Sequence, residues 1–298
     1  MTTPLRLGTR GSALALAQAG RIAGALDGSE LVTVATADSA PAQDKSRFVR
    51  GIENALLAGE VDLAVHSAKD LPGELPEGLE LVSVPAREDP RDCFCGPAGS
   101  LDDVPEGARI GTSSLRRRSQ LLAVRPDLDI VDLHGNVDTR LGRLADGELD
   151  GIVLALAGLR RLGLEAQSSF PFDPALMTPA PGQGTLALEA RIGDMAIAEA
   201  TAPLTDALAL TELLAERAAV AELEASCNTP IGIHAAAAPD RISVESYVGL
   251  PDGSEWLRDR LDGDLGDARA LGREIAERML AAGARDILDR AESQAADA

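Results

Sequence analysis

A strand-like segment, VDLAVHSAKDLP, ends in side chains that can transfer protons and bind anions: His66, Ser67, Lys69 and Asp70. A carboxylate at the C-terminal edge of a buried strand can act as a general acid or base, or stabilise a developing positive charge. Asp70 could equally pair with Lys69 or cap a turn, and the spacing alone leaves both interpretations open. The chain has only two lysines among its 28 basic residues. The use of a lysine at position 69 therefore favours a functional role for this segment over a purely structural one.

Arginines are concentrated in the middle of the chain, although acidic residues outnumber basic ones 48 to 28 overall. Residues 109–161 contain nine arginines against seven acids. Several arginines stand at predicted strand ends or helix starts, where an open α/β sheet binds its ligands: Arg10, Arg116, Arg117, Arg140 and Arg161. Because a guanidinium group pairs with carboxylates or phosphates, the set predicts a small polyanionic ligand. For any single arginine, a solvated helix face remains the alternative.

The three cysteines cannot form a complete set of disulfides, so we expect free thiols. Cys227 follows a helical run and precedes a proline in AELEASCNTPIGIHA. Cys93 and Cys95 alternate along a short apolar stretch and would share one face of a strand. With no second cysteine pair or nearby histidine, we interpret Cys93 and Cys95 as small buried hydrophobic residues and predict no metal site.

The segments around these residues alternate between apolar runs and helical patterns, which predicts two successive α/β units. The first unit has strands at 5–9, 31–36 and 61–67 and helices from about 13 and 46; the second has strands at 109–112, 129–133 and 151–156, a helix through the arginine triplet and another from about 137. The openings RLGTRGSALALAQ and RIGTSSLRRRSQL are alike, and each contains a serine suited to cap a helix, Ser12 and Ser114. Two similar lobes facing a cleft are expected, with chance similarity as the alternative.

A third, smaller α+β unit follows. It has a long helix at about 205–225, two strands at 231–238 and 242–250, and a final helix at about 267–284. The glycines of PGQGT, around Gln183, indicate a hinge or domain crossing rather than a phosphate loop, because no Gly-Lys-Ser/Thr follows them. The predicted domains are residues 1–86 with 184–202, residues 87–183, and residues 203–298.

The composition of the chain restricts the compartment in which the protein works and the classes of molecule that it binds. The 298 residues are 45% hydrophobic and carry a net charge of −20. No apolar run approaches the roughly 18 residues of a membrane span, and we expect a soluble cytoplasmic protein. The acidic surface and scarce lysine indicate a very salty cytoplasm, where about 1 M salt shortens the Debye length to about 3 Å; an ordinary acidic protein is the alternative. Nucleic acid and anionic membranes are disfavoured as partners because they would be repelled.

Eight segments, in order, resemble the porphobilinogen deaminase (hydroxymethylbilane synthase) family: LGTRGSALALAQ, AVHSAKDLP, REDPRDCF, GTSSLRRRSQLLAVRPDL, GNVDTRL, AGLRRLGL, PAPGQGTLALEAR and SCNTPIG. The resemblance spans nearly the whole chain. It implies two lobes like those of type II periplasmic solute-binding proteins, with a small C-terminal α+β domain. It also implies a monomeric transferase of haem biosynthesis, which joins four porphobilinogen molecules head to tail, releases ammonia at each step and frees the linear product by hydrolysis.

The resemblance also implies residue roles. Cys227 would carry a dipyrromethane cofactor through a thioether, and Asp70 would be the catalytic carboxylate. The cofactor would be bound by Asp70 and by Lys69, Ser114, Arg116, Arg117 and Arg140. The substrate porphobilinogen would be bound by Arg10, Ser12, Ser67, His134, Arg140 and Arg161. Since every pyrrole unit bears an acetate and a propionate, the product is a polycarboxylate, in agreement with the ligand predicted from the arginines.

The chain departs from the usual family pattern at several positions. His134 stands before GNV where arginine is usual, and it is a weaker, pH-dependent partner for a carboxylate. The segment ADSAPAQDKSRFVR is shorter and poorer in glycine than its counterpart, and Arg50 replaces a common lysine. Ala225 and Ser226 replace the glycines that usually precede the cofactor cysteine.

Two other functions remain possible from the sequence. A two-lobed anion-binding protein without catalysis would explain the arginines but leave Cys227 and Asp70 without a role. A thiol hydrolase would require Cys227 and a histidine base, which would be His66, His134 or His234, yet no cysteine-protease pattern is present.

Overall fold

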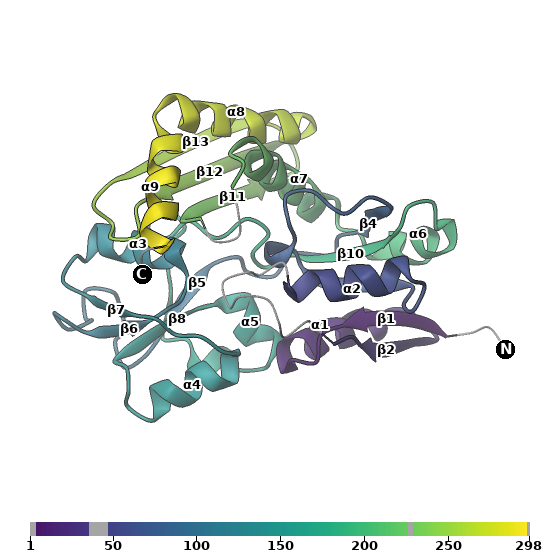
Figure 1. Cartoon of the computed structure of the whole chain (residues 1–298), viewed down its shortest axis with the longest axis horizontal. Helices are drawn as coiled ribbons and strands as arrows, with labels where there is room; N and C mark the ends of the chain where they lie inside the picture. The colour runs from purple at the N-terminus through teal and green to yellow at the C-terminus, as the bar shows by residue number, and fades with distance from the viewer. Residues whose placement is uncertain (1–3, 36–46, 226–228, 297–298) are drawn as a thin grey trace.

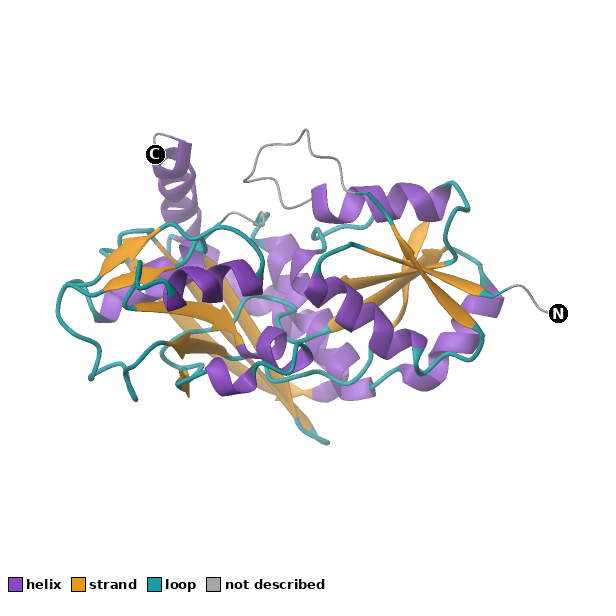
Figure 2. Ribbon diagram, turned by 90° about the horizontal axis from the view of Figure 1, so that it is seen from below, coloured by secondary structure: helices purple, strands orange, loops and turns teal. Residues whose placement is uncertain are grey.

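The computed structural model describes residues 4–35, 47–225 and 229–296. Within them, three sheets are each covered by their own helices and form two lobes and a third domain (Figure 1). The two lobes lie side by side along the long axis, as the view from below shows (Figure 2). No described helix has both the length and the apolarity to cross a membrane.

The first lobe is built on a sheet with the strand order β2-β1-β3-β10-β4. Its strands are β1 (Leu5–Thr9), β2 (Ser29–Thr33), β3 (Leu63–Ser67), β4 (Leu79–Ser83) and β10 (Leu186–Arg191). The strands β1, β2 and β3 are parallel, and β10 runs antiparallel to both of its neighbours. Side chains alternate between the two faces of β3, so that Leu63 and Val65 pack with helix α1 (Ala13–Ala23) and Ala64 packs with α2 (Arg47–Leu57).

The second lobe repeats this arrangement with the order β7-β6-β8-β5-β9. Its elements are β5 (Asp92–Cys95), β6 (Arg109–Gly111), β7 (Asp129–Val131), β8 (Gly151–Ala155) and β9 (Phe170–Pro171), with α3 (Leu115–Val124), α4 (Val137–Ala145) and α5 (Leu156–Arg161). In this lobe β5 is the antiparallel strand that corresponds to β10. The prediction of two similar lobes is therefore confirmed. Cys93 and Cys95 are buried in β5 and face the same cluster of aliphatic side chains, also as predicted.

The third domain is an antiparallel sheet packed against helices. It contains β11 (Ile231–Ala237), β12 (Arg241–Gly249) and β13 (Trp256–Asp264), with α7 (Ala207–Glu222), α8 (Ala268–Ala281) and α9 (Ala284–Ala296); the short helix α6 (Met195–Thr201) precedes it. The α+β prediction is confirmed, and the two expected strands and the expected helix are present as β11, β12 and α8, but the prediction missed the third strand, β13, and the second helix, α9. The edge strand β13 was missed because its sequence, WLRDRLDGD, is mostly charged and offers little hydrophobic signal. Gly283, at φ +104°, separates α8 from α9.

Two segments cross between the lobes, at residues 84–91 and 172–185. They lie side by side, because the Glu88 N–H donates to the Gly184 carbonyl at 3.0 Å. Gly184 has φ +86°, and a Cβ there would overlap the Glu88 backbone. The interpretation of PGQGT as a domain crossing is therefore confirmed. The domain limits at 86/87, 183/184 and 202/203 stay a prediction.

The third domain is attached to these crossings by a buried carboxylate on α7. Glu216 is fully buried and accepts hydrogen bonds from Arg87 at 2.8 Å, from the Gly182 N–H at 2.6 Å and from the Ala235 N–H at 2.8 Å. Burial opposes its charge, but Arg87 and then His234 outweigh burial and lower the pKa of Glu216. One side chain thus joins both crossings to β11.

Candidate active site

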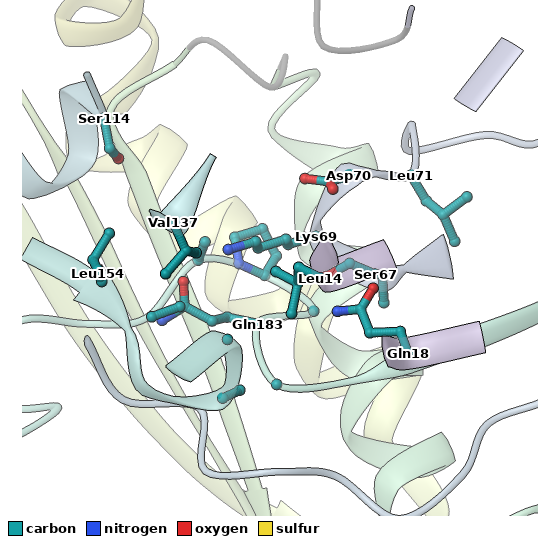
Figure 3. Close-up of a pocket in the computed structure, with 18 of the residues that line it drawn as sticks. Leu14, Gln18, Ser67, Lys69, Asp70, Leu71, Ser114, Val137, Leu154 and Gln183 are labelled. Atoms are coloured by element: carbon teal, nitrogen blue, oxygen red, sulfur yellow. The ribbon is translucent and has the colours of Figure 1, made fainter. Parts of the chain in front are cut away.

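A cavity of about 750 Å³ lies between the two lobes and is closed on one side by α7. Lys69, Asp70 and Gln18 lie on one side and Ser114, Val137 and Leu154 on the other, with Gln183 between them (Figure 3). Among the described lining residues, seven are lysine or arginine and two carry a carboxylate: Arg10, Lys69, Arg116, Arg117, Arg140, Arg161 and Arg217, against Asp70 and Asp138. The cavity is therefore basic in a chain whose net charge is −20.

Asp70 lies at the end of a short 3-10 turn (Ala68–Asp70) that directly follows β3. Its carboxylate is 3.8 Å from the Arg10 guanidinium, and both side chains are about one-quarter exposed, at 22% and 26%. Ser67 and Lys69 of the same segment also line the cavity. The structure thus brings together the first-lobe residues predicted from the sequence.

The turn that holds Asp70 rests on the second crossing. The Ala68 N–H donates to the Thr185 carbonyl at 2.9 Å. Gly182 has φ +72°, and a Cβ at this position would lie 2.8 Å from both the Ala68 carbonyl carbon and the Lys69 nitrogen. Only glycine fits there without displacing the turn.

The N-termini of α1 and α3 face the cavity from opposite lobes. Ser12 caps α1 by accepting from the Ala15 N–H at 3.3 Å, and Ser114 caps α3 by accepting from the Arg117 N–H at 3.5 Å. Both predicted caps are confirmed. A helix N-terminus favours anions through its free N–H groups and its dipole, so each of these ends adds to the basic lining.

Arg116 and Arg117 are more deeply buried than the sequence suggested, at 4% and 6% exposure. Both bind Asp92, which is fully buried; the distances are 2.7 Å from Arg116 Nη1 and 2.9 Å from Arg117 Nε. Burial would raise the pKa of Asp92, but Arg116 and then Arg117 outweigh it and hold the pKa at about 2. Two guanidinium groups share one carboxylate, so the cluster keeps one net positive charge at the cavity wall.

Arg140 and Arg161 complete the basic wall of the second lobe. The Arg140 Nε donates to the Gly135 carbonyl at 2.8 Å, and Arg161 Nη2 donates to the Gly184 carbonyl at 2.6 Å. Burial, followed by Arg117, lowers the pKa of Arg140 to about 10. Burial, followed by Arg21, lowers the pKa of Arg161 to about 10. Both remain charged at neutral pH, and because they are poorly hydrated they favour an anionic ligand.

Some predicted residues lie at the rim or outside the described part of the chain. His134 is exposed and lines the cavity beside the start of α4. Cys227 and Ser226 lie outside the described residues, as do residues 36–46, which include Lys45. The flanking residues Ala225 and Thr229 line the cavity.

Sequence reasoning missed three residues of the site: Gln18, Asp92 and Arg217. Arg217 reaches from α7 to the loop after Asp70 and donates to the Pro72 and Gly73 carbonyls at 2.9 and 2.7 Å. Asp92 lies within the quoted REDPRDCF segment, where an acid beside buried cysteines was a usable signal. Gln18 and Arg217 lie within Ala/Leu-rich helices, and nothing local distinguishes them.

Comparison with known proteins identifies the family. The description "Porphobilinogen deaminase, dipyromethane cofactor binding domain" matches residues 5–199, and "Porphobilinogen deaminase, C-terminal domain" matches residues 210–281. The chain belongs to the porphobilinogen deaminase family. Porphobilinogen deaminase of Trichlorobacter lovleyi is 43% identical over 96% of both chains. That of Thermus thermophilus is 45% identical over 95% of this chain and 97% of the relative.

Solved structures of lower similarity include a Salmonella typhimurium periplasmic binding protein described as having high arginine specificity. It is 12% identical, with a TM-score of 0.41, over 70% of this chain and 94% of that one. A likeness at this level carries no argument about function. The two lobes and the C-terminal domain follow instead from the sheets described above and from membership of the porphobilinogen deaminase family.

The residues present fit the dipyrromethane of this family. Its acid side chains need cations, which both walls supply, and its pyrrole N–H groups need acceptors. Gln183 Nε2 donates to the Pro90 carbonyl at 2.6 Å and to Asp92 at 3.0 Å, which fixes the orientation of the amide. Its Oε1 is buried, with no hydrogen-bond partner among the described residues, at a side chain that borders the cavity. Gln183 is thus a candidate acceptor for an N–H group.

Proposed function

We propose that the basic cavity carries out the reaction of the porphobilinogen deaminase family with the residues named above. The reaction condenses four porphobilinogen molecules into the linear tetrapyrrole hydroxymethylbilane and releases ammonia, as a transferase step of haem and tetrapyrrole biosynthesis. The observation that carries the proposal is the collection of seven lysine and arginine side chains around one cavity in a strongly acidic chain. A polycarboxylate substrate and product require such a lining.

The dipyrromethane would be attached to the thiol of Cys227 and held by cations from both lobes. Lys69 lies on the first-lobe side, and Ser114, Arg116, Arg117 and Arg140 lie on the second. When bound, the dipyrromethane supplies the primer to which the first substrate pyrrole is joined. Because Asp92 fixes Arg116 and Arg117, these two guanidinium groups are held in place before any ligand arrives.

Porphobilinogen would enter on the side of Asp70. This region and the opposite rim are lined by Arg10, Ser12, Ser67, Arg161 and His134. These side chains would bind the acetate and propionate groups. Asp70 would hold the proton that the leaving amine takes, and its carboxylate would then stabilise the positive charge that develops on the pyrrole nitrogen. Arg10, at 3.8 Å, would orient the Asp70 carboxylate between these roles.

The experiment that tests the assignment is the intact mass of the purified, denatured protein, with the Cys227 peptide then mapped. We expect additional mass equal to two linked pyrrole units on the thiol, and none in Cys227→Ser. Asp70→Asn should keep the added mass and lose ammonia release from porphobilinogen. A thiol that stays unmodified after incubation with porphobilinogen would contradict the assignment of Cys227, whereas full turnover by Asp70→Asn would contradict that of Asp70.

We also propose that the chain works as a monomer in the cytoplasm of a cell with high internal salt. The net charge of −20 and the presence of only two lysines support this proposal. A surface of this kind stays soluble where salt screens its self-repulsion. Light scattering in molar salt would measure the oligomeric state.

A further inference from the structure

The segment that follows Asp70 has no helix or strand of its own. Residues 71–78 join the 3-10 turn to β4 and include Pro72 and Pro76. A proline has no N–H group to donate, so local backbone hydrogen bonds hold such a segment less well than a helix or a strand. The second crossing supports the turn before Asp70. The placement of Asp70 therefore also depends on what holds the segment after it.

One face of α7 lies against this segment. Leu213, Arg217 and Val220 are separated by four and three residues, so they share one face of the helix, and all three line the cavity. Leu213 packs with Leu71 in a cluster of buried aliphatic side chains. A Cβ at Gly73 would lie 3.8 Å from a methyl group of Val220. The segment is thus in contact with the third domain on both sides of Arg217.

Arg217 joins this helix face to the segment by two hydrogen bonds. Its Nη1 donates to the Pro72 carbonyl at 2.9 Å, and its Nη2 donates to the Gly73 carbonyl at 2.7 Å. Burial lowers the pKa of Arg217, with Glu189 opposing this effect, and the guanidinium stays charged at neutral pH. Hydrogen bonds from a charged donor are stronger than neutral ones. Because the guanidinium is a rigid planar fork, it fixes two successive carbonyls at once.

The same helix leads to the cysteine that is proposed to carry the cofactor. α7 ends at Glu222, five residues before Cys227 in the sequence. Ala225, which lies between them, lines the cavity. One helix therefore holds the segment after Asp70 and also leads into the segment of Cys227.

We propose that Arg217 is a positioning residue for Asp70, which it places relative to α7 by holding the two carbonyls of Pro72 and Gly73. The inference rests on the proposed role of Asp70 as the catalytic carboxylate. Arg217 does not touch the substrate in this scheme, and its effect reaches the reaction through the segment that follows Asp70. A cation in the cavity lining could instead bind a substrate carboxylate, and the two roles change different kinetic constants.

The first test is the split between kcat and KM for porphobilinogen in Arg217→Lys and Arg217→Gln. Lysine keeps the charge but lacks the planar fork, and glutamine lacks the charge. Misplacing a catalytic group by about 1 Å can cost roughly 100-fold in rate, so we expect kcat to fall between about 10-fold and 100-fold in both variants, with KM unchanged. A raised KM in Arg217→Gln, with kcat intact and with normal kinetics in Arg217→Lys, would overturn the inference and assign Arg217 to substrate binding.

Chemical rescue of Arg217→Ala separates the fork from the charge. A guanidinium ion carries the same planar set of N–H donors as the missing side chain, and it can reach the site because Arg217 lines the cavity. Methylammonium supplies a positive charge without the fork. We expect guanidinium, at concentrations that leave the chain folded, to restore part of kcat and methylammonium to restore none. Equal rescue by the two ions would contradict the proposed role.

Amide hydrogen exchange gives a readout that does not depend on activity, with Arg125→Lys as the matched control. Arg125 also forks between two carbonyls, with Nη1 2.8 Å from Leu101 O and Nη2 3.0 Å from Val104 O, but it lies outside the cavity lining. The Arg217 variants should exchange faster at residues 71–78, because the segment loses its support. Arg125→Lys should exchange faster near residues 101–104 and keep kcat. Unchanged exchange at residues 71–78 in every Arg217 variant would overturn the inference.

Asp70→Asn, assayed alongside, separates this inference from the proposed function. If Asp70→Asn is inactive while the Arg217 variants keep normal kinetics, the proposed role of Asp70 stands and the role of Arg217 is overturned. If Asp70→Asn turns over normally, the role of Asp70 fails and the positioning role fails with it. Intact mass gives the fraction of each variant that carries the cofactor, and kcat is calculated for that fraction. Arg217→Lys, the mildest change, gives the decision if the other variants do not fold.

Discussion

Asp92 is the residue on which the second-lobe wall of the cavity depends. It is fully buried, and its two carboxylate oxygens accept hydrogen bonds from Arg116, Arg117 and Gln183. Without its charge, two buried guanidinium groups would face each other. Breaking a buried charge cluster by removing one partner typically costs about 3 to 5 kcal/mol.

We expect Asp92→Asn to lower the free energy of unfolding by about 3 to 5 kcal/mol in urea titrations at neutral pH. Asp127→Asn, which removes the partner of Arg125 at the surface, is the control and should change stability far less. The pKa of Asp92 in the folded chain, about 2, is lower than that of an unfolded aspartate. Its contribution should therefore be complete above about pH 4 and disappear as the pH falls through about 2. Equal stability of both variants would contradict the prediction.

His134 gives a second prediction at the residue scale. His134→Arg supplies a permanent cation with a planar pair of donors, which binds a carboxylate more strongly than an imidazole. We expect the Michaelis constant for porphobilinogen to fall about tenfold, the lower end of the gain from a hydrogen bond between charged groups, because the site is exposed. His134→Gln should raise the constant or leave it unchanged. If His134→Arg changes nothing, His134 does not contact the substrate.

At the scale of elements, the turn at Asp70 depends on how closely the second crossing approaches it. Gly182→Ala places a methyl group against Ala68 and Lys69, and must move the turn. Misplacing a catalytic group by about 1 Å can cost roughly 100-fold in rate. We expect kcat to fall between about 10-fold and 100-fold while the protein still folds.

Gly163→Ala is the matched control for this change. Gly163 has φ +71°, nearly the same as Gly182, but a Cβ there meets nothing within 4 Å. Both variants therefore carry the same backbone strain, measurable as a lower melting temperature, and only Gly182→Ala displaces the turn. A similar kcat in the two variants would show that the close approach does not position Asp70.

Some helices and strands could be predicted from the sequence and others could not. The parallel strands and the helix caps at Ser12 and Ser114 were predictable, because hydrophobic period and capping chemistry are local signals. The strand β13 was not, since most of its residues are charged and only Leu257 and Leu261 are aliphatic, which leaves little hydrophobic signal at a sheet edge. The pairing of Asp92 with Arg116 and Arg117 joins residues more than twenty positions apart, and no local pattern encodes it.

For the whole molecule, the contrast between a −20 chain and a basic cavity has a consequence for kinetics. At low salt the acidic surface repels a carboxylated substrate over long distances, whereas at about 1 M salt the Debye length of about 3 Å leaves only the nearby arginines effective. We expect the Michaelis constant for porphobilinogen to fall as salt rises to molar levels. The measurement needs circular dichroism at each salt concentration, and a flat or rising constant with an intact fold would contradict the expectation.

The strand β10 sits between β3 and β4 in the first sheet, although it follows the entire second lobe in the sequence. The strands of the second sheet all lie between residues 92 and 171. The chain leaves the ribosome from its N-terminus, so all strands of the second sheet are available before the first sheet is complete. The strand β4 has no strand to pair with until residues 186–191, which form β10, have been synthesised. The sheet of the lobe that carries Asp70 is therefore the later one to be completed during synthesis. The two crossings between the lobes thus also determine the order in which the sheets can form.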